Sequence, residues 1–137
     1  MLEVTWNSGL QFDAALPEGG TFTMDATPEH GGAGKGPTPV EALLASAAAC
    51  SAMDVVGILQ KKRMTIESYR VEVDWDRSPG PGYPRPVTAI RLNHILSGPD
   101  LERSAIDQAV SLSDERYCTV IATLRIPVTI TSAWQLE

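Results

Sequence analysis

The chain has 137 residues, of which 43% are hydrophobic and 20% charged, a size and composition that suit one globular domain with its own core. Its net charge of −6 argues against DNA, RNA or an anionic membrane surface as a partner, because each would require a basic face. The N-terminal residues lack the basic and apolar regions of a secretory signal, and no later run is free of charge over the length of a membrane span. We therefore expect a cytoplasmic protein without a membrane segment.

Residues 1–25 are predicted to form three short strands of an antiparallel meander. Apolar and polar residues alternate in residues 2–6, 10–14 and 21–25, and turn signals containing glycine separate these segments. Residues 26–37 follow as a glycine-rich loop. This loop resembles a phosphate-binding loop only superficially, because its spacing differs from that motif and Pro37 interrupts the row of N–H donors. A nucleotide site is not expected there.

A long central helix is predicted over residues 38–62. Thr38 can cap it, Pro39 suits the first helical position, and Glu41 completes a capping box. The middle of the helix is apolar on nearly all sides and contains few polar or reactive residues: Ser46, Cys50, Ser51 and Asp54. Such a helix must be buried on most sides, so we expect it to form the core of the fold.

Two long strands are predicted within residues 65–97, because apolar residues alternate on both sides of a loop rich in proline and glycine. Helices follow in residues 100–124, with Asp100 as the cap of the first helix and Ser113 to Tyr117 as an interruption. A last strand is predicted over residues 127–134. This order indicates an α+β fold with antiparallel sheets around one long buried helix. So much sheet around one apolar helix favours a second copy as cover, and we expect an obligate dimer.

The two cysteines are the residues with the most distinctive chemistry. In a reducing compartment they are either reactive thiols or plain buried residues rather than a permanent disulfide. Cys50 has small and polar neighbours one helical turn away, which leaves room around a reactive atom. His94 is interpreted as an ordinary surface or core residue and His30 as a solvated loop residue. Two cysteines and two histidines this far apart lack the spacing of a zinc site, so no metal or cofactor is expected.

Two segments carry a resemblance to a known family. Residues 37–54 contain Cys50 within an alanine-rich helix, and residues 112–118 read Leu-Ser-Asp-Glu-Arg-Tyr-Cys and end at Cys118. Together they resemble the OsmC/Ohr family of osmotically inducible and organic hydroperoxide resistance proteins, most closely its YhfA-like branch. The resemblance implies one OsmC-like domain over residues 1–137. It also implies an intertwined homodimer whose two central helices pack back to back inside the sheets.

The resemblance further implies a redox role for both cysteines. Cys50 matches the peroxidatic cysteine of the family, and Cys118 matches its resolving partner. In that chemistry a thiolate attacks the peroxide O–O bond to give a sulfenic acid, and the second thiol condenses with it to a disulfide. A dithiol or lipoyl-type reductant then restores both thiols. The implied function is a cysteine-dependent peroxidase that reduces organic or small hydroperoxides.

The chain departs from the family pattern at the residues that activate the thiol. Peroxidases of the family have an arginine on an early strand and a glutamate ten positions before the reactive cysteine, where this chain has Val40 and no arginine before Arg63. Glu41 lies nine positions before Cys50, on the opposite face of a helix. The alternative function is therefore a non-catalytic family member that binds a hydrophobic or thiol-bearing small molecule in the dimer cleft.

Other charged residues are candidates for supporting Cys50. Lys35, Arg116 or His30 could supply the positive charge that a thiolate needs, and Glu115 lies beside Arg116 in the second motif. Asp54, one turn beyond Cys50, would oppose the thiolate if it were ionised, unless it orients a cation or carries a proton. The plainer interpretation is that Asp54 meets a backbone donor or a lysine at the dimer interface.

Overall fold

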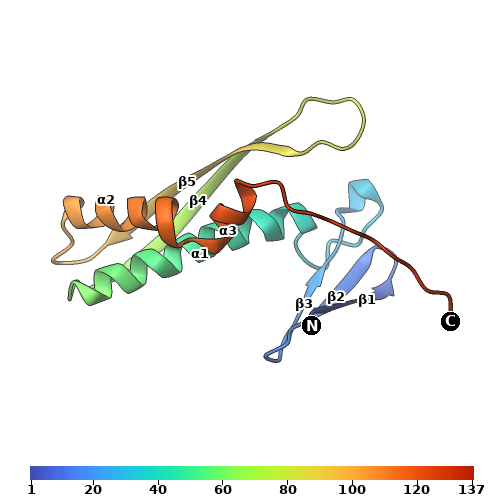
Figure 1. Cartoon of the computed structure of the whole chain (residues 1–137), viewed down its shortest axis with the longest axis horizontal. Helices are drawn as coiled ribbons and strands as arrows, with labels where there is room; N and C mark the ends of the chain where they lie inside the picture. The colour runs from blue at the N-terminus through green and yellow to red at the C-terminus, as the bar shows by residue number, and fades with distance from the viewer. The chain divides into compact units, whose positions relative to one another are not determined.

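The computed structural model describes all 137 residues, which fall into two compact units, Met1–Ser46 and Ala47–Glu137. The long helix α1 (Pro39–Lys61) begins in the first unit and continues through the second (Figure 1). Antiparallel strands form two separate sheets, one of three strands in the order β1-β2-β3 and one of two strands, β4-β5. The predicted α+β class is confirmed.

The sheet of the first unit is the predicted meander. It consists of β1 (Glu3–Ser8), β2 (Gln11–Ala15) and β3 (Thr21–Met24), with β2 in the centre (Figure 1). Phe12 on β2 pairs with Trp6 on one side and with Met24 on the other. Ala14 is buried, whereas the larger Trp6, Phe12 and Phe22 remain exposed. The three strands that the alternation of apolar and polar residues predicted are therefore present and pair in chain order, although their aromatic side chains are exposed.

A buried carboxylate organises the glycine-rich loop that follows β3. Asp25 is 2% exposed, and its two oxygens accept backbone N–H groups of Lys35 at 3.1 Å, Ala26 at 2.7 Å and Ala33 at 3.2 Å. The hydrogen bond from Lys35, followed by those from Ala26 and Ala33, holds the pKa of Asp25 below its ordinary value. The N–H donors of this loop thus surround a side chain of the protein itself.

Two glycines of the same loop lie directly against backbone. A Cβ at Gly32 would overlap the carbonyl group of Ala26, and a Cβ at Gly36 would overlap the carbonyl oxygen of Thr23. The Gly32 N–H also donates to the Thr27 carbonyl at 3.0 Å. These glycines are needed because the loop folds back on itself without room for side chains.

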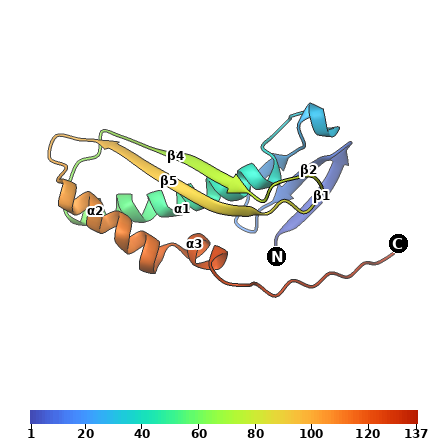
Figure 2. The same cartoon turned by 90° about the horizontal axis from the view of Figure 1, so that it is seen from above.

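The second unit contains the hairpin of β4 (Ser68–Arg77) and β5 (Val87–Ser97). Three helical segments follow: α2 (Arg103–Leu112), the π-helical turn η2 (Ser113–Tyr117) and α3 (Thr119–Leu124). Figures 1 and 2 show α1 and α2 running beside each other next to the β4-β5 ribbon. Their contact is a small core in which Val55, Leu59 and Ala109 are 0% exposed and Ala105 is 6% exposed. The two alanines allow α2 to approach α1 closely.

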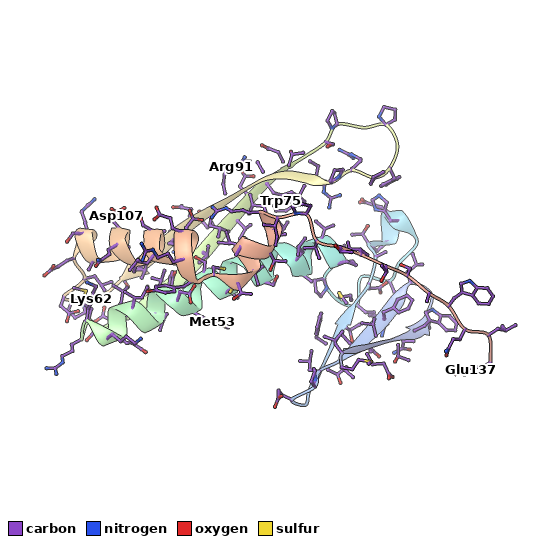
Figure 3. All side chains as sticks on the ribbon, viewed as in Figure 1. Met53, Lys62, Trp75, Arg91, Asp107 and Glu137 are labelled. Carbon is purple, nitrogen blue, oxygen red and sulfur yellow. The ribbon has the colours of Figure 1, made fainter.

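Helix α1 begins as predicted. The Thr38 N–H donates to Glu41 Oε2 at 2.9 Å, and the Glu41 N–H donates to Thr38 Oγ1 at 3.2 Å, which is a reciprocal capping box. The single chain buries less of this helix than predicted. Its buried side chains in the second unit follow helical spacing along one face, at Ala47, Ala48, Ser51, Val55 and Leu59. Met53 is 72% exposed and lies on the side of α1 away from α2 (Figure 3).

By length and composition, α1 is apolar enough to cross a membrane. Its most apolar window of 18 residues has a mean hydropathy of 1.9, and 33% of that window is buried. The core helix of a soluble protein passes the same test, so the finding is weak support for a membrane segment.

Two predicted features need correction. The N-cap of α2 is Glu102 rather than Asp100, and it makes no side-chain cap hydrogen bond. Asp100 instead accepts the Thr65 N–H at 2.9 Å, which ties the segments flanking the hairpin together. Residues 127–134 form no strand, although their sequence alternates, because a strand requires a neighbouring strand to exchange hydrogen bonds and no strand of this chain pairs with them.

The close packing of the loop predicts that Gly32→Ala destabilises the protein. The added Cβ would overlap backbone, and overpacking of this kind costs about 1–3 kcal/mol. We expect the unfolding temperature followed by circular dichroism to fall by about 3–12 °C. The matched control is Gly57→Ala in α1, where a Cβ meets nothing within 4 Å, so that the unfolding temperature should stay level or rise. A Gly32→Ala protein as stable as the wild type would contradict this packing.

The hydrogen bonds of Asp25 predict a loss of stability in acid. A carboxyl whose pKa is lower in the folded state contributes stability above its unfolded pKa of about 3.9, and this contribution is lost as the pH falls through the folded pKa. Urea unfolding from about pH 7 to about pH 3 should therefore show a smaller pH dependence for Asp25→Asn than for the wild type. Equal pH dependence in the two proteins would count against this role of Asp25.

Candidate functional site

The two cysteines both lie in the second unit, one on α1 and the other at the start of α3. Both are free, with Cys50 half-buried on α1 and Cys118 only 3% exposed at the N-cap of α3. Burial is the main cause that raises the pKa of the Cys118 thiol. The hydrogen bond that the Ile121 N–H donates to the Cys118 Sγ at 3.4 Å lowers this pKa in part, and the neighbouring Cys50 side chain raises it further. Cys50 is therefore the thiol that a solute reaches more easily.

The π-helical turn η2 sets the position of Cys118. It continues α2 without a break, and the Cys118 N–H donates to the Ser113 carbonyl at 2.9 Å, a hydrogen bond across five residues. Cys118 then has extended backbone, with φ −74° and ψ 103°, and its sulfur caps α3. The predicted interruption of the helix at Ser113 to Tyr117 is this turn. Such turns are frequent at functional sites in proteins.

A chain of polar contacts runs through the second unit beside Cys50. Tyr69 Oη lies 2.6 Å from His94 Nδ1, and His94 Nε2 lies 3.5 Å from Ser51 Oγ. Ser113 Oγ in turn lies 3.2 Å from Ser51 Oγ and donates to Asp54 Oδ2 at 2.8 Å. Side chains from β4, β5, α1 and η2 thus meet in one network.

Ser113 is the donor in its contacts, with its hydroxyl directed to Asp54 Oδ2 at 2.8 Å and to Ser51 Oγ at 3.2 Å. His94 lies between the Tyr69 hydroxyl, at Nδ1, and the Ser51 hydroxyl, at Nε2. Burial lowers the pKa of His94 and raises the pKa of Tyr69 to about 12, which favours the neutral form of both groups.

Asp54 has a partner that the sequence did not suggest. Instead of a backbone donor, a lysine or another cation, its side chain meets the hydroxyl of Ser113, which is 0% exposed. Asp54 also borders a cavity of about 580 Å³, whose other lining residues are Met53, Gly57, Ile58, Lys61, Lys62, Leu112 and Tyr117. One side of Asp54 therefore takes part in the polar network, and its other side lines this cavity.

The remaining candidate residues have other contacts or lie exposed on their own element. Glu41 is used in the capping box, and Lys35 contributes its backbone N–H to Asp25; both residues belong to the first unit. Glu115 and Arg116 are exposed on η2 and make no side-chain hydrogen bond or ion pair. No lysine, arginine or histidine side chain is hydrogen-bonded to either sulfur.

Sequence reasoning missed most of the polar network. It interpreted His94 as an ordinary residue and gave no role to Tyr69, Ser51 or Ser113. One signal was available: His94 and Tyr69 occupy positions on otherwise apolar faces of β4 and β5, and a half-buried histidine on such a face needs a partner. The donors of the site are thiols, hydroxyls, an imidazole and a carboxylate, and no group of three or more His, Cys, Asp or Glu side chains could hold a metal ion.

Comparison with known proteins identifies the family of this chain. Residues 32–133 match the family model described as OsmC-like protein. The chain is 38% identical to Protein YhfA of Escherichia coli (strain K12) over 133 residues, which cover 97% of this chain and 95% of that relative.

Solved structures share the fold. A hypothetical protein from Aquifex aeolicus VF5 is similar with a TM-score of 0.78 and 30% identity, over 91% of this chain and 86% of that chain. An organic hydroperoxide resistance protein OsmC from Legionella pneumophila, described as a predicted redox protein, has a TM-score of 0.65 and 16% identity over 91% of this chain and 89% of its own. Because the family model and the relative cover most of the sequence, this chain belongs to the OsmC family.

Proposed function

We propose that this OsmC-family protein is a cysteine-dependent peroxidase that reduces organic or small hydroperoxides through Cys50 and Cys118. The observation that supports the proposal is the pair of free thiols on elements joined by Ser113, which hydrogen-bonds to Ser51, the residue after Cys50, and to the backbone N–H of Cys118. The family supports it, since the Legionella protein of the same fold is described as an organic hydroperoxide resistance protein.

The reaction uses the two thiols in sequence. The Cys50 thiolate attacks one peroxide oxygen and the O–O bond breaks, which leaves a sulfenic acid on Cys50 and an alkoxide that takes up a proton to become an alcohol. The Cys118 thiol then attacks the sulfenic sulfur, so that an S–S bond forms, the S–O bond breaks and water leaves. A dithiol or lipoyl-type reductant returns both residues to thiols and becomes a disulfide itself.

The environments of the two thiols favour Cys50 as the first nucleophile. Cys118 is nearly inaccessible, and burial raises its pKa, which lowers the share of the reactive thiolate. Cys50 is half-buried and so meets a dissolved hydroperoxide sooner. This assignment agrees with the peroxidatic and resolving roles that the family resemblance implies.

A second candidate function is the binding of a hydrophobic or thiol-bearing small molecule without catalysis. It is favoured by the cavity of about 580 Å³ at Asp54, where Met53, Ile58 and Leu112 supply apolar surface. It is also favoured by the absence of a cationic side chain hydrogen-bonded to either sulfur. Substantial peroxide turnover by purified protein in which this cavity is empty would exclude it.

We also propose that the working form is a cytoplasmic homodimer. Large apolar side chains remain on the surface of one chain: Met53 on α1 is 72% exposed, and Ile130 and Trp134 near the C-terminus are 84% and 86% exposed. Surfaces of this kind usually meet a partner. Two cysteines that the proposed cycle returns to thiols suit a reducing compartment such as the cytoplasm.

The proposed reaction predicts how free thiols respond to peroxide. One equivalent of an alkyl hydroperoxide should remove both thiols of the reduced wild-type chain, because a single turnover ends in a disulfide. Cys118→Ser should instead stop at a sulfenic acid on Cys50 that dimedone labels, and Cys50→Ser should keep its remaining thiol. Thiol titration and intact mass measure all three results. If the wild-type thiols stay titratable in excess peroxide, the proposed function is wrong.

The proposed dimer predicts a solution mass of about twice 14.7 kDa. Met53→Glu should weaken self-association at least about tenfold, because it places an unpaired charge in a contact that is apolar. Gln108→Glu, on the exposed face of α2, serves as the control and should leave association unchanged. Analytical ultracentrifugation over a range of concentrations provides the measurement. A wild-type protein that is monomeric at every concentration would refute the dimer.

A further inference from the structure

Ser113 contacts the surroundings of both cysteines. Its hydroxyl donates to Asp54 Oδ2 at 2.8 Å and lies 3.2 Å from Ser51 Oγ and 3.4 Å from the Ser51 carbonyl oxygen. Its own carbonyl oxygen accepts the N–H of Cys118 at 2.9 Å. Ser51 directly follows Cys50 in the chain. Ser113, which begins the π-helical turn before Cys118, is therefore hydrogen-bonded both to the turn of α1 that carries Cys50 and to the backbone of Cys118.

Burying the Ser113 side chain costs free energy of folding unless its hydroxyl group is hydrogen-bonded. Ser113 is 0% exposed and Ser51 is 2% exposed, so neither hydroxyl can exchange its partners for water. The bond from Ser113 to Asp54 is short and ends on a charged acceptor, which makes it stronger than a bond between neutral groups. Contacts from Ser51 through His94 to Tyr69 extend this group of side chains to the β4-β5 hairpin. A rotation of η2 against α1 would break these contacts together.

We infer that Ser113 is a positioning residue that holds the turn carrying Cys118 against the turn of α1 carrying Cys50. The inference rests on the proposed function and concerns its second step, in which the Cys118 thiol displaces water from the sulfenic sulfur of Cys50. Ser113 touches no reacting atom and acts through Asp54 and Ser51. Without it, η2 moves more freely, and the effective concentration of Cys118 at Cys50 decreases.

Substitutions at Asp54 separate this role from acid–base chemistry. Asp54→Asn removes the charge but keeps an oxygen that can accept the Ser113 hydroxyl proton, whereas Asp54→Ala removes both. If the hydrogen bond positions the turn, the asparagine variant resembles the wild type and the alanine variant resembles Ser113→Ala. A role of Asp54 as proton carrier would instead make both Asp54 variants equally defective.

The test measures the effective concentration of the Cys118 thiol relative to Cys50, from the equilibrium between the dithiol and the disulfide form of the protein in a glutathione redox buffer. This measurement requires no peroxide. Ser113→Ala and Asp54→Ala are expected to lower it by about tenfold, and Asp54→Asn to leave it within about threefold of the wild type. The matched control is Ser111→Ala, which removes an exposed hydroxyl of α2 two residues away and should change nothing. Thermal unfolding of each variant confirms that it is folded at the temperature of the assay.

A kinetic measurement completes the test. In Ser113→Ala treated with one equivalent of an alkyl hydroperoxide, formation of the Cys50 sulfenic acid should keep its rate while closure of the disulfide slows about tenfold. An unchanged effective concentration in Ser113→Ala overturns the inference, and so does an Asp54→Asn variant as defective as Asp54→Ala. If the wild-type thiols stay titratable in excess peroxide but Ser113→Ala still lowers the effective concentration, the proposed function fails and the positioning role stands.

Discussion

The close approach of α2 and η2 to one face of α1 decides where both thiols lie. The contact is built from small residues, since Ala105 and Ala109 on α2 pack against Val55 and Leu59 of α1 with almost no exposed surface. Larger side chains at these two alanines would separate the helices and carry η2 away from Cys50. The position of Cys118 therefore depends on packing about two to four helical turns earlier in the chain.

A polar network is embedded in this apolar contact. Hydroxyl groups of Ser51 and Ser113 lie at the contact between α1 and η2, and they are satisfied by His94 on one side and Asp54 on the other. Buried hydrogen bonds of this kind fix a relative position better than apolar packing alone, because sliding by a fraction of a turn leaves polar groups without partners. The same burial lowers the pKa of His94 and raises the pKa of the Cys118 thiol, which favours the neutral form of both groups.

The features that could be predicted from the sequence are those whose partners are close in the chain. The capping box of Thr38 and Glu41 spans three residues, and alternation along the hairpin strands is a local pattern. The network could not be predicted, because Ser51 and His94 are 43 residues apart and Asp54 and Ser113 are 59 residues apart. Glycine content indicated a loop before α1 but did not show that Asp25 occupies its centre. The pairing of Cys50 with Cys118 came from family resemblance rather than from any local pattern.

The most direct test of the proposed peroxidase reaction is to identify which sulfurs are joined after one turnover. Reduced protein treated with one equivalent of an alkyl hydroperoxide would be quenched by alkylation, digested without reduction and mapped by mass spectrometry. The proposed reaction ends in a disulfide between Cys50 and Cys118 of the same chain. Peptides in which both cysteines carry the alkylating group, or in which Cys50 is joined to Cys50 of a second chain, would contradict it.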